Sequence, residues 1–225
     1  THFGAKKEDW DGINFGTPTN DSLKDSWNTL VSLAGDVNSA GSESARTAAY
    51  MKLQGLNPDG SNNEGLADFL NVDNMCDYLL VNWYTGNADW PQRNYYTGRE
   101  RDLLDPVAWR GSRISEGMHF FMWDVETSMF LNSDRNRTGK IDGVNVPFGS
   151  LRGSKEFQVR MGDRAHRALF NGGALTANEA MVRYADITKD HRSILIPELA
   201  RWGDQHGVQR TIQQWESAYN QIQGQ

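Results

Sequence analysis

The sequence predicts a mainly α-helical protein with a small β-hairpin or sheet, which is the α+β fold class. Apolar residues recur at helical spacing over much of the chain, whereas residues 94–97 and 119–123 have strand-like composition. Residues 1–20 are expected to form an irregular or short-strand segment. The chain has 225 residues, of which 38% are hydrophobic, enough for one substantial core. Because no clear linker interrupts this pattern, we expect a single domain over residues 1–225.

The helices expected before the first strand combine an apolar face with a glycine or turn signal at the end. They span residues 21–34, 43–54, 66–70 and 72–84. Gly35 and Gly86 are the expected ends of the first and last of these helices. The helix over 72–84 is the most apolar, so we expect it at the centre of the core. Its exit leads into a loop, a strand, a charged loop or hairpin tip at 99–117, and the returning strand.

The segment after the second strand, residues 132–153, is polar and rich in glycine, so we interpret it as a connection. Helices follow at 156–170, from 177 onward, and at 209–221. Thr176 and Glu179 form a capping-box pattern at the start of the long middle helix. Pro197 should kink or restart that helix.

Composition excludes several classes of function. The net charge of −6 gives no general attraction to nucleic acid or to anionic membranes. A single cysteine excludes an intrachain disulfide framework and a multi-cysteine zinc site. No stretch is apolar enough to predict a membrane span. The cysteine content says little about the compartment, since a secreted bacterial protein can do without disulfides. We favour a secreted or cell-surface location over a cytoplasmic one.

Two neighbouring segments carry candidate catalytic residues. Asp89 follows the apolar helix, Asn94 comes five residues later, and Asp124 ends the apolar second strand. An acid that positions a hydroxyl, together with amide and carboxylate oxygens for magnesium, is what phosphoryl transfer needs. Glu126 is a further candidate metal ligand, because on a continuing strand it would share a face with Asp124. The alternative is a helix-exit turn in which Asp89 and Asn94 hydrogen-bond nearby backbone amides.

The amino-acid sequence around these residues is a more specific indication of a protein family than their spacing is. The segment L-V-N-W-Y-T-G-N-A-D-W-P-Q-R-N-Y-Y, then H-F-F-M-W-D-V-E-T-S-M-F and F-N-G-G-A-L-T, resembles the CotH kinase family of atypical, spore-coat protein H-like kinases. The resemblance implies the C-terminal lobe of a protein-kinase-like fold that uses ATP and magnesium to phosphorylate Ser or Thr of a protein substrate. It implies that Asp89 is the catalytic-loop acid and that Asn94 and Asp124 bind metal. Asn87 stands where ordinary kinases have the catalytic-loop histidine.

The sequence departs from a complete kinase at its N-terminal side. None of the lysines before the motif lies in a convincing strand, and no G-x-G-x-x-G is present, although kinases use a strand lysine beneath a glycine-rich cover to hold nucleotide phosphates. We therefore expect the chain to be part of a longer polypeptide. The missing N-terminal part of its own chain would then be a partner, and this part alone would bind nucleotide weakly.

A second motif resembles the first nine positions of a calcium loop. Its oxygen-bearing residues are Asp134, Asn136, Thr138 and Asp142, with Gly139 at the sixth position. The twelfth position lacks the bidentate glutamate, so we favour an ordinary polar loop.

Three functions remain open from the sequence. The leading interpretation is a kinase-like phosphotransferase. The second is a non-catalytic surface or extracellular module that binds protein or glycan through the same scaffold. The third is a metal-dependent hydrolase that uses Asp89 and Asp124 around one cation.

Overall fold

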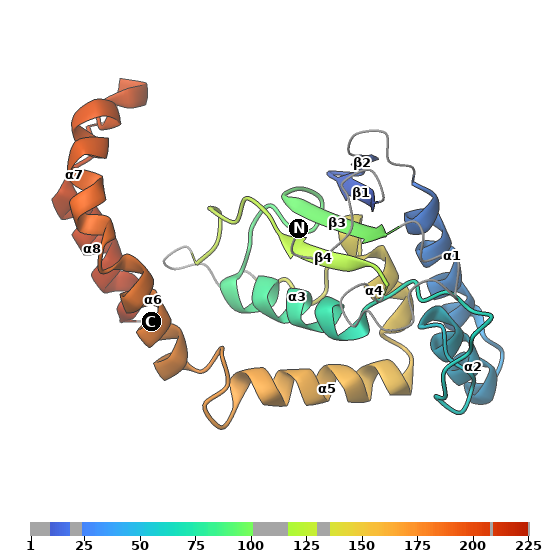
Figure 1. Cartoon of the computed structure of the whole chain (residues 1–225). Coiled ribbons are helices and arrows are strands. Elements are labelled where there is room, and N and C mark those ends of the chain that lie inside the picture. Colours follow the sequence, from blue (N-terminus) through green and yellow to red (C-terminus); the bar gives the residue numbers. More distant parts are fainter. Residues whose placement is uncertain (1–9, 19–23, 101–116, 130–135, 208, 225) are drawn as a thin grey trace. The chain divides into compact units, whose positions relative to one another are not determined.

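The computed structural model describes residues 10–18, 24–100, 117–129, 136–207 and 209–224 (Figure 1). The sequence led to a prediction of one domain, and the structure groups the chain into two compact units. Unit 1 comprises Thr1–Ser128 and Asp134–Ala165, and unit 2 comprises Met129–Ser133 and His166–Gln225. The mainly α-helical class with a small antiparallel sheet is confirmed.

Unit 1 combines an antiparallel sheet with helices. Its strands are β1 (Trp10–Asn14), β2 (Thr17–Pro18), β3 (Tyr95–Glu100) and β4 (His119–Met122), in the order β2-β1-β3-β4. Its helical elements are α1 (Asp25–Ser39), α2 (Glu43–Leu53), α3 (Val72–Thr85), η3 (Gly143–Asn145), α4 (Val146–Leu151) and most of α5 (Lys155–Leu169). The two predicted strand segments thus pair with each other as β3 and β4, and β1 adds to the other side of β3, so that β4 lies at an edge of the sheet.

Helix α3 forms the centre of the core, as the sequence predicts. The side chain of Asn71 caps its N-terminus by accepting from the backbone N–H of Asn74, and Gly86 ends it with φ of 59°. Met75 and Leu79 are almost fully buried on its inner face. These local signals are sufficient to set both ends of the helix.

Asn74 also ties α3 to the outer strand of the described sheet. Its Oδ1 accepts from the backbone N–H of Phe120 at 2.6 Å, and its Nδ2 donates to the Phe120 carbonyl at 3.3 Å. The side-chain amide therefore takes the place of a neighbouring strand at this point of β4 and leaves no open edge there.

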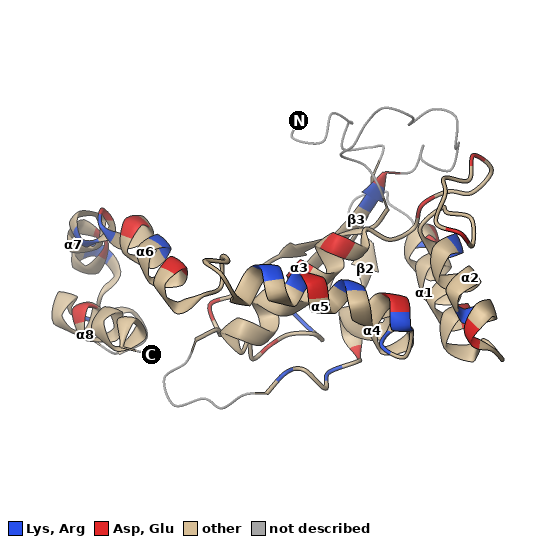
Figure 2. Cartoon of the chain, turned by 90° about the horizontal axis from the view of Figure 1, so that it is seen from below, with Lys and Arg blue, Asp and Glu red and all other residues tan. Residues whose placement is uncertain are grey.

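Salt bridges join α3 to α5 on the surface of unit 1. Figure 2 marks the basic and acidic positions along the ribbon. Arg160 donates two hydrogen bonds to the carboxylate of Asp73, and Arg164 donates two to that of Asp77. Such bidentate pairs fix geometry more than they add stability, because the side chains are partly exposed.

Three sequence predictions in unit 1 are wrong. Helix α1 continues past Gly35 to Ser39, because Val37 is fully buried and extends the apolar stripe. Residues 66–70 are not helical. Their backbone pairs with other segments instead, for example through the Phe69 N–H to the Leu53 carbonyl at 3.0 Å.

The third error concerns the polar connection at 132–153, which contains η3 and the short helix α4. Pro147 lies at the start of α4, where its missing N–H costs nothing. Phe148 and Leu151 face the core. Burial of these few apolar residues stabilises a helix that is too short for periodicity to reveal.

Unit 2 contains the end of α5 followed by α6 (Ala177–Thr188), α7 (His191–Trp202), η4 (Gln205–Gly207) and α8 (Ile212–Gln223). The predicted long helix restarts at His191, and Pro197 lies inside α7. The predicted capping box is wrong, because the Thr176 hydroxyl donates to the Gly173 carbonyl at 2.8 Å. A capping box is present instead at Thr211.

Among the residues that the structure describes, no helix is long and apolar enough to cross a membrane.

Candidate functional site

The antiparallel register of β3 and β4 brings the two candidate segments together. Tyr95 at the start of β3 pairs with Met122 at the end of β4. Asn94 immediately precedes this pair and Asp124 follows it closely. In an antiparallel pair, the start of one strand lies beside the end of the other, at the same end of the pair. The predicted site residues therefore gather at one end of the strand pair.

Asp89 and Asn94 contact each other within the loop that joins α3 to β3. The Asn94 side chain donates from Nδ2 to Asp89 Oδ2 at 3.4 Å, a long hydrogen bond. The Asp89 carbonyl accepts from the Arg93 N–H at 3.0 Å, which closes the loop. Among the described residues, no donor forms a hydrogen bond with the Asn94 amide oxygen, so this oxygen is available to a cation.

The backbone is strained at two of the predicted metal ligands. Asn94 has φ of 56° and Asp124 has φ of 49°, in the left-handed region. Asn and Asp tolerate this region better than other side chains do, but it still costs free energy. Such conformations concentrate where a chain positions functional groups.

Asp124 and Glu126 lie on exposed chain beyond β4. The prediction that Glu126 continues the strand is wrong, because β4 ends at Met122. The two carboxyl groups nevertheless meet. The pKa of Glu126 is raised, first by a hydrogen bond with Asp124 and also by the negative charges of Asp124 and Asp89. All three acids therefore belong to one electrostatic cluster.

Asn87 joins the two segments from a fully buried position. Its Nδ2 donates to Asn82 Oδ1 of α3 at 2.9 Å, and its Oδ1 accepts from the Thr127 hydroxyl at 3.3 Å. The Ala88 N–H donates to the Thr127 carbonyl at 3.2 Å. Asn87 is thus placed to orient the loop around Asp89 rather than to contact a substrate.

Trp90 anchors the same loop in the core. It is fully buried, and its Nε1 donates to the Tyr78 hydroxyl of α3 at 2.9 Å. Trp123, next to Asp124, is half exposed and packs against Tyr96 with ring centroids 6.1 Å apart. Of these two tryptophans, only Trp123 remains accessible beside the acids.

Sequence reasoning missed a third segment, residues 137–144, which forms hydrogen bonds with the loop that carries Asp89. Arg137 donates from Nη2 to the Ala88 carbonyl, and the Val144 N–H donates to the Pro91 carbonyl at 3.1 Å. Gln92 donates to Asp142. About fifty residues separate these partners in the chain, so no local pattern could reveal them.

The calcium-like loop uses some of its oxygens internally. Asn136 Oδ1 accepts from the Thr138 N–H at 2.9 Å and from its hydroxyl at 2.6 Å. Asp142 accepts from Gln92, and Asp134 lies outside the described residues. These contacts are those of a polar loop, and calcium binding there stays a prediction.

The acids do not form a complete protein cage for a metal. Within the described ranges, no group of three or more His, Cys, Asp or Glu side chains is arranged to hold an ion. Magnesium, however, is usually bound through one or two carboxylates together with water and substrate phosphates. Asp124 and the amide oxygen of Asn94 are of the ligand types that this mode requires.

Comparison with known proteins gives no identification: no family model, no curated protein and no solved structure matches the chain.

Proposed function

We propose that this chain provides the catalytic loop and metal ligands of a kinase-like phosphotransferase that transfers phosphate from ATP to hydroxyl groups of a protein. Asp89 would accept the proton of the acceptor hydroxyl or orient it. Asn94 and Asp124 would hold magnesium, with Glu126 close enough to assist. ATP and magnesium would supply the phosphoryl group and the charge that offsets its negative oxygens.

The main support for this proposal is that two segments far apart in the chain lie at the same end of the β3–β4 strand pair. Asp89 and Asn94 come from the exit of α3, and Asp124 and Glu126 come from the exit of β4. The negative charges of Asp124 and Asp89 both raise the pKa of Glu126, so the two segments are close enough for their charges to interact. The contact between the Asp124 and Glu126 carboxyl groups concentrates negative charge, which a divalent cation would relieve.

The phosphates of a nucleotide need a further basic group. In the described part of the chain before Asp89, Lys24 lies at the start of α1 and Lys52 in the last turn of α2, so neither is on a strand. The proposal therefore assigns the phosphate-holding lysine to residues outside the described ranges or to an N-terminal part of a longer chain.

The test is transfer of labelled phosphate from ATP to protein by the full-length parent. Asp89→Asn and Asp124→Ala should each abolish transfer, because one removes the proton acceptor and the other a metal ligand. Asp186→Asn, an exposed acid of α6, is the matched control and should leave transfer unchanged. Activity of the Asp89 and Asp124 variants equal to that of the wild type would exclude the assignment.

A second candidate is a non-catalytic binding module. It is favoured by the lack of a metal-holding group of His, Cys, Asp or Glu among the described residues. Titration with Mn²⁺ distinguishes the two. The phosphotransferase requires Mn²⁺ binding in the presence of ATP that Asp124→Ala weakens, whereas the binding module predicts no difference between the variant and the wild type.

A further inference from the structure

A large groove in unit 1 takes no part in the proposed phosphate transfer. It lies between the end of α2, the loop that leads to α3 and the first half of α5, and its volume is about 1210 Å³. Pockets for small molecules usually hold about 300 to 1,000 Å³. The size and open shape of this groove suit a segment of polypeptide better than a metabolite.

The groove lies at the opposite end of α3 from the candidate site. Asn71, Val72 and Asp73 at the N-terminus of α3 line it, whereas Asp89 follows the C-terminus of the helix. The 14 residues of α3 span about 21 Å at 1.5 Å per residue. A ligand in the groove would therefore not compete with groups bound at Asp89.

The lining of the groove is predominantly acidic. Its carboxylates are Glu64, Asp68, Asp73, Glu156 and Asp163, and its cations are Lys155 and Arg160. Arg160 is already neutralised by its two hydrogen bonds to Asp73. Lys155 extends toward Glu43 of α2, with 3.9 Å between Nζ and Oε1. Glu156 and Asp163 form no salt bridge within the described residues, so this part of the lining is negative.

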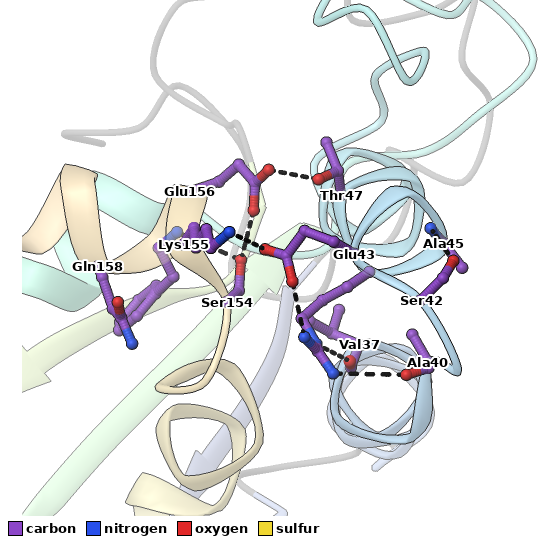
Figure 3. Close-up of polar contacts among 12 residues, drawn as sticks. Val37, Ala40, Ser42, Glu43, Ala45, Thr47, Ser154, Lys155, Glu156 and Gln158 are labelled. Atoms are coloured by element: carbon purple, nitrogen blue, oxygen red, sulfur yellow. Dashed lines mark hydrogen bonds and ion pairs between the residues drawn. The ribbon is translucent and has the colours of Figure 1, made fainter.

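Glu156 is a carboxylate held in place for recognition (Figure 3). Its Oε1 accepts from the Thr47 hydroxyl of α2, and its Oε2 accepts from the Ser154 hydroxyl at 2.9 Å. Partial burial opposes ionisation, but the hydrogen bonds from Thr47, from its own backbone and from Ser154 outweigh it, so the pKa of Glu156 is lowered. The group is therefore ionised at neutral pH.

Lys155 acts on Glu156 with an opposite charge, but more weakly than the hydrogen bonds do. Hydroxyl groups orient the Glu156 carboxylate, and within the described residues it forms no salt bridge. Asp163 lies two helical turns further along α5 on the rim of the same groove and is exposed. Beside them, Val159 presents an exposed apolar side chain. Fixed negative charge next to apolar surface suits the long stems and charged ends of Lys and Arg.

We propose that this groove docks an extended segment of a partner protein that carries lysine or arginine, with Glu156 and Asp163 as its main charge contacts. Docking goes beyond phosphate transfer and requires neither ATP nor metal. Where the partner is also a substrate, the groove would hold it at a distance from Asp89.

The test is fluorescence anisotropy with a labelled short peptide of alternating lysine and serine, without nucleotide. The wild-type protein should bind this peptide saturably, and binding should weaken as NaCl rises from about 50 to about 300 mM. A peptide with glutamate in place of lysine should not bind. Glu156→Gln, which keeps the shape of the side chain, should weaken binding about fivefold, and addition of Asp163→Asn should weaken it further.

Two further variants separate recognition from misfolding. Lys155→Gln removes a repulsive charge from the groove and should strengthen binding about twofold, a gain that misfolding cannot produce. Glu198→Gln, an exposed acid of α7, should change nothing. Equal affinity of the Glu156→Gln, Asp163→Asn double variant and the wild type, or equal binding of the acidic peptide, would overturn the proposal. Loss of phosphate transfer alone would not affect it.

Discussion

Gly143 should be among the least replaceable residues near the candidate site. It has φ of 58°, and a Cβ at this position would lie 2.2 Å from the carbonyl oxygen of Pro91 and 2.7 Å from its carbonyl carbon. Both atoms belong to the backbone of the loop that carries Asp89. A side chain at residue 143 would therefore push that loop away, because no rotamer change can relieve an overlap with backbone.

The magnitude can be worked out from two separate costs. Alanine in the left-handed region costs about 1–2 kcal/mol. The overlap with Pro91 adds about 1–3 kcal/mol, as for other overpacked positions. Gly143→Ala should thus lower the free energy of unfolding by about 2–5 kcal/mol.

Two other glycines serve as controls for these costs. Gly60 has φ of 83° with open space around its Cβ position, so Gly60→Ala isolates the backbone cost of about 1–2 kcal/mol. Gly139 has open space and no positive φ, so its replacement should change stability by less than about 0.5 kcal/mol. Urea unfolding followed by circular dichroism measures all three. Equal losses for Gly143→Ala and Gly60→Ala would refute the argument from the Pro91 contact.

Three further predictions concern single contacts. Trp90→Phe removes the donor to the Tyr78 hydroxyl and part of a buried ring, so it should cost about 2–3 kcal/mol in urea unfolding; a loss below about 0.5 kcal/mol would contradict this view of the loop. Asn74→Ala leaves the N–H and carbonyl of Phe120 without their side-chain partner and should cost about 1–3 kcal/mol, whereas Asn74→Asp keeps the acceptor and should cost less. As a second measurement, hydrogen exchange of the Phe120 amide should become faster in Asn74→Ala but not in Asn74→Asp. Burial lowers the pKa of His119 below its unfolded value of about 6.5, so the unfolded state takes up a proton first and stability should fall as pH drops below that value. His119→Asn should remove this part of the pH dependence of unfolding, and an unchanged profile would show that another group causes it.

Local signals were sufficient for the elements that position Asp89. The sequence predicts a helix over 72–84, and α3 spans Val72–Thr85. Asn71 and Gly86 set its ends through hydrogen bonds and dihedral angles within a few residues, which is why the sequence could show them. The strands on either side of the acids were predictable for the same reason, since their composition is strand-like over a short window.

Long-range contacts decided what local patterns could not. Burial of Val37 against the core carries α1 past Gly35, and burial of Phe148 and Leu151 creates α4 within a segment that looks like a polar connection. The backbone of Phe69 is satisfied by distant segments and not by helical hydrogen bonds: its N–H donates to the carbonyl of Leu53 at the end of α2, and its carbonyl accepts from the Met118 N–H.

The candidate site shows the same division. The sequence identified Asp89, Asn94 and Asp124 as residues of the right chemistry. Only the register of β3 with β4 brings Asn94 to the same end of the strand pair as Asp124. Only the fold allows Arg137 to donate a hydrogen bond to the carbonyl of Ala88. The physical reason is that a hydrogen bond or a buried contact between residues far apart in the chain forms only when the whole core closes, and no short window of sequence carries that information.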